Sequence, residues 1–310
     1  MNVYRNLLIL SATSVILACS SVSDHAREIV YQCGIQDVTA TFANETVTLA
    51  MRGQQQQLQQ VVAASGAHFK SNDGRTSYWN KGSEATITWH DENLPLCSEQ
   101  GKLPNNVAFS GNEPFWLLTL NRDHVSYNTP EQELEFAASP AEYNDDNDWL
   151  IALSDAGEEV GQLRINSSIC YDSMSGKAFP YSVKLVLQGN EYRGCGGETT
   201  QLIQGQPWQL SAMTGSSGSM LDRPSLQFLT EGRLVGTDGC NRFFGHYSVD
   251  GEIPRLSVQG ATKRMCSQAS MTFAQKFIEN LNNTSKIDIK EDKLVLKVNS
   301  GQQLTFAPKY

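Results

Sequence analysis

The residues with the most definite chemistry in this sequence are its seven cysteines. Two thiols can be oxidised to a disulfide, and an odd number leaves one cysteine that needs another role. Cys19 stands apart at the end of an apolar segment. The other six form sequential pairs: Cys33 with Cys97, Cys170 with Cys195, and Cys240 with Cys266. Six cysteines permit many connectivities, but disulfides usually form within one domain, so the sequence favours three disulfide-bonded modules.

The segment before Cys19 indicates what this cysteine does. Arg5 supplies a positive charge near the N-terminus, and residues 7–17 are almost wholly apolar. This run is too short to span a bilayer and is typical of a signal peptide, which we expect over residues 1–18. Ala18 followed by Cys19 resembles a bacterial lipobox, which implies that the thiol receives a diacylglycerol after cleavage. The alternative is a secreted protein without a lipid.

A lipid anchor determines the expected location of the protein. Ser20 follows Cys19, whereas an aspartate there would favour retention at the inner membrane. The resemblance therefore implies an outer-membrane lipoprotein that faces the periplasm, with residues 19–28 as its tether. Each buried methylene of the acyl chains adds about 0.8 kcal/mol to membrane binding. The periplasm is oxidising, which is compatible with three disulfides.

Length and charge limit the remaining possibilities. A mature chain of about 290 residues suits two or three domains. The net charge of −9 is uneven: residues 20–100 carry 9 acids and 5 bases, residues 101–205 carry 15 and 6, and residues 206–310 carry 9 and 12. Such a chain is a poor candidate for binding nucleic acid. Its acidic modules favour a cationic protein as partner.

Residues 29–100 alternate between apolar and polar side chains. Val38, Ala40 and Phe42 point to one face of a strand, and residues 47–51 and 85–89 repeat the pattern. Period-two alternation between turn residues predicts antiparallel β structure. We expect the glutamine-rich residues 54–60 to form a loop and an edge strand.

Two short motifs in this module combine a polar group, a glycine and an aromatic ring. Residues 65–69 read Ser-Gly-Ala-His-Phe, and residues 78–82 read Tyr-Trp-Asn-Lys-Gly. Together with Tyr31, Cys33 and Cys97, they resemble the membrane-bound inhibitors of C-type lysozyme. That family consists of small periplasmic β-barrel proteins, so the resemblance implies an antiparallel barrel over residues 29–100.

The same resemblance implies a set of lysozyme-binding residues. A serine and a lysine of these motifs enter the lysozyme cleft, and here they are Ser65 and Lys81. The predicted set is completed by the neighbouring glycines and aromatic residues of the motifs: Gly66, Phe69, Tyr78 and Gly82. Phe69 replaces a tyrosine that is common in the family. An ammonium can pair with the ionised carboxylate of lysozyme, and a hydroxyl can hydrogen-bond its protonated acid.

Other side chains in the module have less specific patterns. His68 and His90 lack the spacing of metal ligands, and the cysteines are better used in disulfides, so we expect no metal and no cofactor. Trp79 and Trp89 are expected to belong to the core.

Residues 105–203 are predicted to form a central β-rich module. Strand patterns lie at residues 118–120, 125–127, 150–153 and 183–187, and Gly189-Asn190 is typical of a hairpin turn. The motifs around the two cysteines resemble an uncharacterised family of bacterial envelope lipoproteins.

Two clusters of polar residues in this central module permit a chemical interpretation. Glu113, Asp172 and Ser175 could form an acid pair and a nucleophile, although Asp172 and Ser175 are also common turn formers. The acidic loop at residues 145–148 (Asp145, Asp146 and Asp148) is expected to be solvated, with a weak calcium site as the alternative.

Residues 205–310 combine strand patterns with one helical pattern. Apolar residues recur at helical spacing from Met271 to Leu281, after Ser267 or Ser270 as the N-cap. The segment from Gly236 to Tyr247, with Pro207-Trp208 before it, is similar to the META family, which includes a heat-inducible bacterial lipoprotein. This resemblance implies an α+β module with one main helix on an antiparallel sheet.

Taken together, these patterns predict a mainly β protein that is not an enzyme. The sequence lacks a Gly-x-Ser-x-Gly elbow, a His-Glu-x-x-His motif and a phosphate-binding loop, so no residue is predicted to be catalytic. The leading hypothesis is an outer-membrane lipoprotein that inhibits C-type lysozyme through Ser65 and Lys81 and so protects peptidoglycan. The alternative is an envelope-stress or antibiotic-tolerance lipoprotein that acts through its META module.

Overall fold

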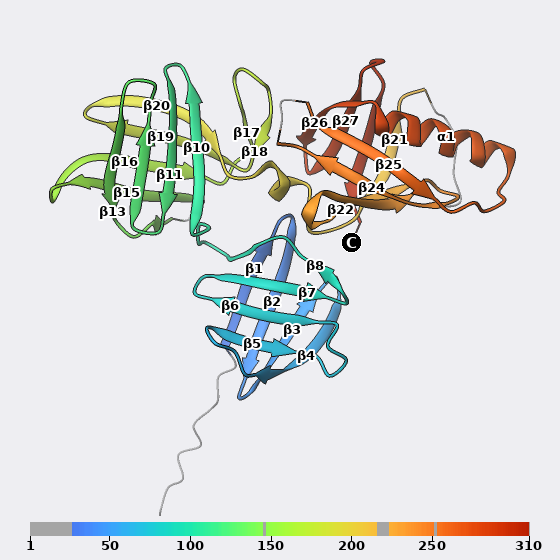
Figure 1. Ribbon diagram of the computed structural model, residues 1–310, viewed down its shortest axis with the longest axis horizontal. Helices are drawn as coiled ribbons and strands as arrows, with labels where there is room; N and C mark the ends of the chain where they lie inside the picture. Colours follow the sequence, from blue (N-terminus) through green and yellow to red (C-terminus); the bar gives the residue numbers. More distant parts are fainter. Residues whose placement is uncertain (1–26, 145–146, 216–222, 251–252, 310) are drawn as a thin grey trace, which may run out of the picture.

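A computed structural model describes residues 27–144, 147–215, 223–250 and 253–309. Three β-rich modules follow one another along the chain, and the first lies below the other two in Figure 1. The prediction of a mainly β protein is confirmed. The predicted signal peptide, Cys19, Asp145 and Asp146 lie outside the described residues. Within the described ranges, no helix has the length and apolar character needed to cross a membrane.

The first module is a closed antiparallel barrel, as the sequence predicts. Its strands are β1 (Arg27–Cys33), β2 (Gln36–Ala43), β3 (Thr46–Met51), β4 (Gln54–Val61), β5 (Ala67–Lys70), β6 (Ser77–Lys81), β7 (Glu84–Trp89), β8 (Glu92–Asn93) and β9 (Cys97–Glu99). The order β6-β5-β4-β3-β2-β1-β9-β7 closes because β6 also pairs with β7, and β8 adds to β7 outside the ring. Alternate side chains point into the barrel.

The glutamine-rich segment differs from our expectation. It forms the complete strand β4, which pairs with β3 on one side and with β5 on the other. Leu58 is fully buried, whereas most of its neighbours in the strand are exposed. The prediction of a loop and an edge strand was wrong because a closed barrel has no edge.

The second module is also a closed antiparallel barrel. Its strands are β10 (Asn106–Asn112), β11 (Phe115–Asn121), β12 (His124–Asn128), β13 (Glu133–Ala138), β14 (Glu142–Tyr143), β15 (Asp148–Asp155), β16 (Glu158–Asn166), β17 (Cys170–Tyr171), β18 (Ala178–Phe179), β19 (Tyr181–Leu187) and β20 (Asn190–Gly196). Pairing of β13 with β15 closes the ring. The predicted hairpin turn joins β19 to β20, and β17 pairs with β18 in a separate two-stranded sheet.

The third module is an antiparallel sheet with one α-helix in its described residues, which confirms the predicted α+β architecture, and the sheet is open. Its elements are η1 (Thr199–Leu202), β21 (Trp208–Met213), β22 (Ser225–Phe228), η2 (Thr230–Gly232), β23 (Arg233–Thr237), β24 (Arg242–Ser248), β25 (Arg255–Ala261), α1 (Gln268–Asn282), β26 (Thr284–Lys290), β27 (Lys293–Val298) and β28 (Gln303–Pro308). The Ser267 side chain caps α1 by accepting a hydrogen bond from the Ser270 amide. Phe277 and Leu281 are fully buried on the inner face of the helix.

Disulfides lie within the modules and hydrogen bonds join them. The predicted pairs Cys33–Cys97, Cys170–Cys195 and Cys240–Cys266 are all present. The amide of Ile35 in the first module donates to the carbonyl of Gln204 at 2.9 Å. Trp149 of the second module donates to the carbonyl of Gly101 at 3.0 Å.

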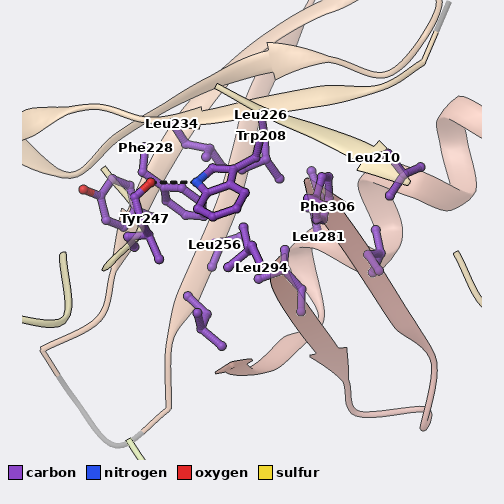
Figure 2. Close-up of a cluster of buried hydrophobic side chains, with 14 of the residues drawn as sticks. Trp208, Leu210, Leu226, Phe228, Leu234, Tyr247, Leu256, Leu281, Leu294 and Phe306 are labelled. Atoms are coloured by element: carbon purple, nitrogen blue, oxygen red, sulfur yellow. Dashed lines mark hydrogen bonds between the residues drawn. The ribbon is translucent and has the colours of Figure 1, made fainter. Parts of the chain in front are cut away.

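Trp208 lies at the centre of the core of the third module (Figure 2). Its side chain is 1% exposed, and its indole N–H donates to the carbonyl of Ile203 at 2.7 Å. The surrounding side chains come from the sheet and from α1: Leu226, Phe228, Leu256, Leu281, Leu294 and Phe306. This residue therefore combines a large buried apolar area with a satisfied hydrogen bond.

Replacing Trp208 is expected to destabilise the third module strongly. Trp208→Ala should lower its free energy of unfolding by about 3–5 kcal/mol, because it leaves a cavity and removes the partner of Ile203. Phe244→Ala is the matched control, since Phe244 is 58% exposed. Its effect should stay within about 0.5 kcal/mol. Urea denaturation of both variants measures the difference, and equal losses would contradict the central role of Trp208.

Candidate functional site

Strand pairing brings the two motifs of the first module to the same place. Ser65 and Gly66 lie in the loop that leads into β5, and Lys81 ends β6 before the turn at Gly82. Strands β5 and β6 are antiparallel, with Ala67 opposite Asn80. The start of one strand therefore lies beside the end of the other. The structure brings Ser65 and Lys81 to one rim of the barrel, although sixteen positions separate them in sequence.

Trp79 connects the two halves of this rim. Its indole N–H donates to the carbonyl of Ser65 at 2.8 Å. The ammonium of Lys81 lies 3.9 Å from the centre of the indole ring, in a cation–π contact. On the same strand pair, the ring of His68 stacks on Trp79 with a centroid distance of 5.5 Å. Burial, followed by the charge of Lys70, lowers the pKa of His68 and favours the neutral ring in this stack.

The position of Trp79 corrects our expectation that it belongs to the core. The side chain is partly exposed, whereas Tyr78 before it is fully buried, because adjacent residues of a strand point to opposite faces. Trp89, by contrast, is 5% exposed and does belong to the core. The alternation of buried and exposed side chains along β6 is the sequence signal that could have identified Trp79 as a surface residue.

Gly66 allows the loop to pass close to β6. Its φ is +70°, and a side chain at this position would overlap the backbone oxygen of Asn80. Gly82 also has a positive φ, +71°, but has open space around it. Glycine is therefore needed at residue 66 for both conformation and space, and at residue 82 for conformation only.

Buried hydroxyl and amide groups support the rim from inside. The hydroxyls of Tyr31 and Tyr78 are 2.8 Å apart. The Asn80 amide donates to the hydroxyl of Tyr31 and to the carbonyl of Gly82, each at 2.9 Å. Burial raises the pKa of Tyr78, which keeps its hydroxyl protonated. This network fixes the turn that follows Lys81.

The burial of two predicted binding residues changes their expected role. Phe69 is 4% exposed and Tyr78 is 0% exposed, and their rings contact each other inside the barrel. Side chains in these positions stabilise β5 and β6 and do not reach the surface. We call the remaining surface residues the Ser65–Lys81 rim: Ser65, Gly66, Trp79, Lys81 and Gly82.

The charge of the rim comes from Lys81. Its side chain is exposed, and within the described residues no carboxylate forms an ion pair with it. Glu84 lies opposite Lys81 in the β6–β7 pairing, but its carboxylate accepts a hydrogen bond from the amide of Asn105 at 2.7 Å. The ammonium is therefore held over an aromatic ring and directed at solvent. Such a group can pair with a carboxylate of another molecule.

The polar cluster of the second module has the geometry of a turn. The Asp172 carboxylate accepts hydrogen bonds from the hydroxyl and the amide of Ser175, both at 2.7 Å, and from the side chain of Asn112 at 2.7 Å. Burial alone would raise the pKa of Asp172, but these hydrogen bonds lower it. The arrangement fits the turn-forming alternative.

Comparisons with known proteins identify two of the modules. The family model for the membrane-bound lysozyme-inhibitor of C-type lysozyme matches residues 31–95. The META domain model matches residues 201–310. The resemblances that the sequence indicates for the first and third modules are therefore confirmed, and the one for the second module stays a prediction.

One curated relative shows the family of the chain. It is the membrane-bound lysozyme inhibitor of C-type lysozyme from Yersinia enterocolitica serotype O:8 / biotype 1B, with 35% identity over 105 residues. The alignment covers 33% of this chain and 88% of that protein. Through its first module, the chain belongs to the family of membrane-bound lysozyme inhibitors of C-type lysozyme.

Two solved structures share weaker similarity with the chain. An NMR structure of a protein from Burkholderia xenovorans has 20% identity and a TM-score of 0.31, covering 35% of this chain and 85% of that one. A crystal structure of a DUF4847 family protein from Bacteroides vulgatus ATCC 8482 has 13% identity and a TM-score of 0.30, covering 36% of this chain and 96% of that one.

The two rim glycines should respond differently to substitution. Both Gly66→Ala and Gly82→Ala force a left-handed conformation on alanine, which costs about 1–2 kcal/mol. Only the new methyl group at residue 66 meets the backbone of Asn80. We expect Gly66→Ala to lower the free energy of unfolding of the first module further than Gly82→Ala does, as measured by urea denaturation. Equal losses would contradict the close approach of the loop to β6.

Proposed function

We propose that this protein inhibits C-type lysozyme by inserting Ser65 and Lys81 into the active-site cleft of the enzyme. The observation that carries the proposal is the Ser65–Lys81 rim, in which Trp79 binds the Ser65 backbone and contacts the Lys81 ammonium. Family membership of the first module supports it. The rim performs no chemistry of its own, because it acts by occupying the site.

The chemistry of lysozyme explains why these two groups suit its cleft. The enzyme uses a protonated carboxylic acid as general acid and a second, ionised carboxyl group. The Lys81 ammonium would pair with the ionised group, while the Ser65 hydroxyl would hydrogen-bond the acid. Because Trp79 already holds Lys81, less side-chain entropy is lost on binding than for a freely rotating lysine.

Location and charge complete the proposal. We infer a lipoprotein that is acylated at Cys19, anchored in the outer membrane and directed at the periplasm, where it protects peptidoglycan. The net charge of −9 would attract a cationic lysozyme. The alternative function through the META module stays a prediction.

A lysis assay tests the proposed function directly. Residues 20–310, which include every described residue, are mixed with hen lysozyme and a suspension of bacterial cell walls. We expect the rate of lysis to fall at micromolar concentrations of the protein. Full lytic activity at those concentrations would refute the proposal.

Lys81→Ala tests the role of the ammonium. Loss of one partner of a buried interfacial charge pair costs roughly 2–5 kcal/mol, so the inhibition constant should rise by roughly tens to thousands of times. Lys263→Ala is the matched control, because Lys263 is an exposed lysine of the third module and lies outside the rim. It should leave the inhibition constant within about twofold, as expected of a surface residue away from the interface. An unchanged constant for Lys81→Ala would remove this residue from the mechanism.

The acidic surface should act mainly on the rate of association. Raising the ionic strength from about 0.01 M to about 0.15 M shortens the Debye length from roughly 30 Å to roughly 8 Å. Stopped-flow measurements should therefore show slower association with lysozyme and a nearly constant dissociation rate. Association that does not depend on salt would exclude electrostatic steering.

A further inference from the structure

A cavity of about 440 Å³ lies where the three modules meet, apart from the Ser65–Lys81 rim. The first module lines it with Leu96 and the second with Tyr143 and Tyr181. The third module contributes Gln201, which lies in η1, and Gln206, which lies just before β21. Small-molecule sites have volumes of roughly 300–1,000 Å³ and occur preferentially at domain interfaces. Both the size and the place of this cavity fit that class.

The cavity wall carries a buried polar group that lacks a partner in the described part of the chain. Gln206 lines this wall, and only 3% of its surface is exposed. The side-chain oxygen of Gln201 is buried and without a partner among the described residues. A buried amide oxygen is costly when left unpaired, so the Gln201 oxygen indicates a partner that enters from outside.

Tyr181 adds a third polar group to the wall. Burial raises the pKa of its hydroxyl to about 12, so the group remains a neutral donor. Two carboxamides and one phenol can together donate and accept hydrogen bonds without contributing charge.

The rest of the wall offers aromatic surface. The rings of Tyr143 and Trp149 lie 5.1 Å apart, and those of Trp149 and Tyr181 lie 5.9 Å apart at right angles. The Trp149 N–H and the Tyr143 hydroxyl already have partners in Gly101 and Asn147. These two residues therefore present ring surface and not donors. Tyr143 is 45% exposed, so a ligand can reach it.

We propose that this cavity binds a short, uncharged saccharide that carries N-acetyl groups. A carboxamide side chain pairs its donor and its acceptor with an acetamido group, which suits Gln206 and Gln201. The apolar face of a pyranose ring packs against aromatic rings such as those of Tyr143 and Tyr181. The charged residues that line the cavity are two acids and one base, so the lining has no cluster of one sign that would select a charged ligand: Glu99, Asp292 and Lys102.

Ligand-observed NMR on residues 20–310 tests this proposal. With N,N′-diacetylchitobiose we expect saturation transfer to the acetyl groups, and with cellobiose, which lacks them, at least tenfold weaker binding. Gln206→Leu should weaken diacetylchitobiose binding at least tenfold. Gln132→Leu is the matched control, because Gln132 is exposed in the β12–β13 turn, and it should bind as the unaltered protein does.

Several outcomes would overturn the proposal. One is the lack of saturation transfer at millimolar diacetylchitobiose, and another is undiminished binding by Gln206→Leu. Equal binding of cellobiose would contradict the acetamido contact. If Gln206→Leu fails to fold, Tyr143→Ala replaces it. Tyr143 is exposed, so its replacement should disturb folding less. This variant should also weaken binding. Lys81→Ala should bind the saccharide normally, so this test is independent of lysozyme inhibition.

Discussion

The position of β6 between β5 and β7 is the constraint on which the candidate site depends. One face of this strand buries Tyr78 and the other presents Trp79, and its end carries Lys81. Pairing with β5 places the Ser65 loop beside Trp79, and pairing with β7 makes the turn at Gly82. A shift of one residue in this register would exchange the two faces. The indole would then enter the barrel, and the rim would lose both of its contacts.

Contacts from both faces of β6 hold the rim in place. On the outer face, the indole N–H of Trp79 holds the Ser65 carbonyl, and its ring lies against the Lys81 ammonium. On the inner face, Tyr31, Tyr78 and Asn80 join the barrel wall to the turn. A surface arranged before binding loses less entropy when it meets a partner. This principle explains why an inhibitor benefits from a small closed barrel.

The three modules are stabilised separately and are joined by contacts between their surfaces. Each has its own hydrophobic core and its own disulfide, so each is stabilised locally. Hydrogen bonds join the modules, and the surfaces that they bring together line the cavity. A binding site for a small ligand can therefore form between modules while the Ser65–Lys81 rim stays within one of them.

Much of this organisation follows from the sequence, because it depends on local patterns. Strand alternation, the helical spacing after Ser267 and the cysteine pairs determine the β-rich modules, the single helix and the disulfides. Closure of the second module into a barrel, the surface position of Trp79 and the burial of Phe69 were decided by tertiary structure. The cavity near Gln206 was also decided by tertiary structure. These features arise when segments distant in the chain pair or pack, and no local period records which segments will meet.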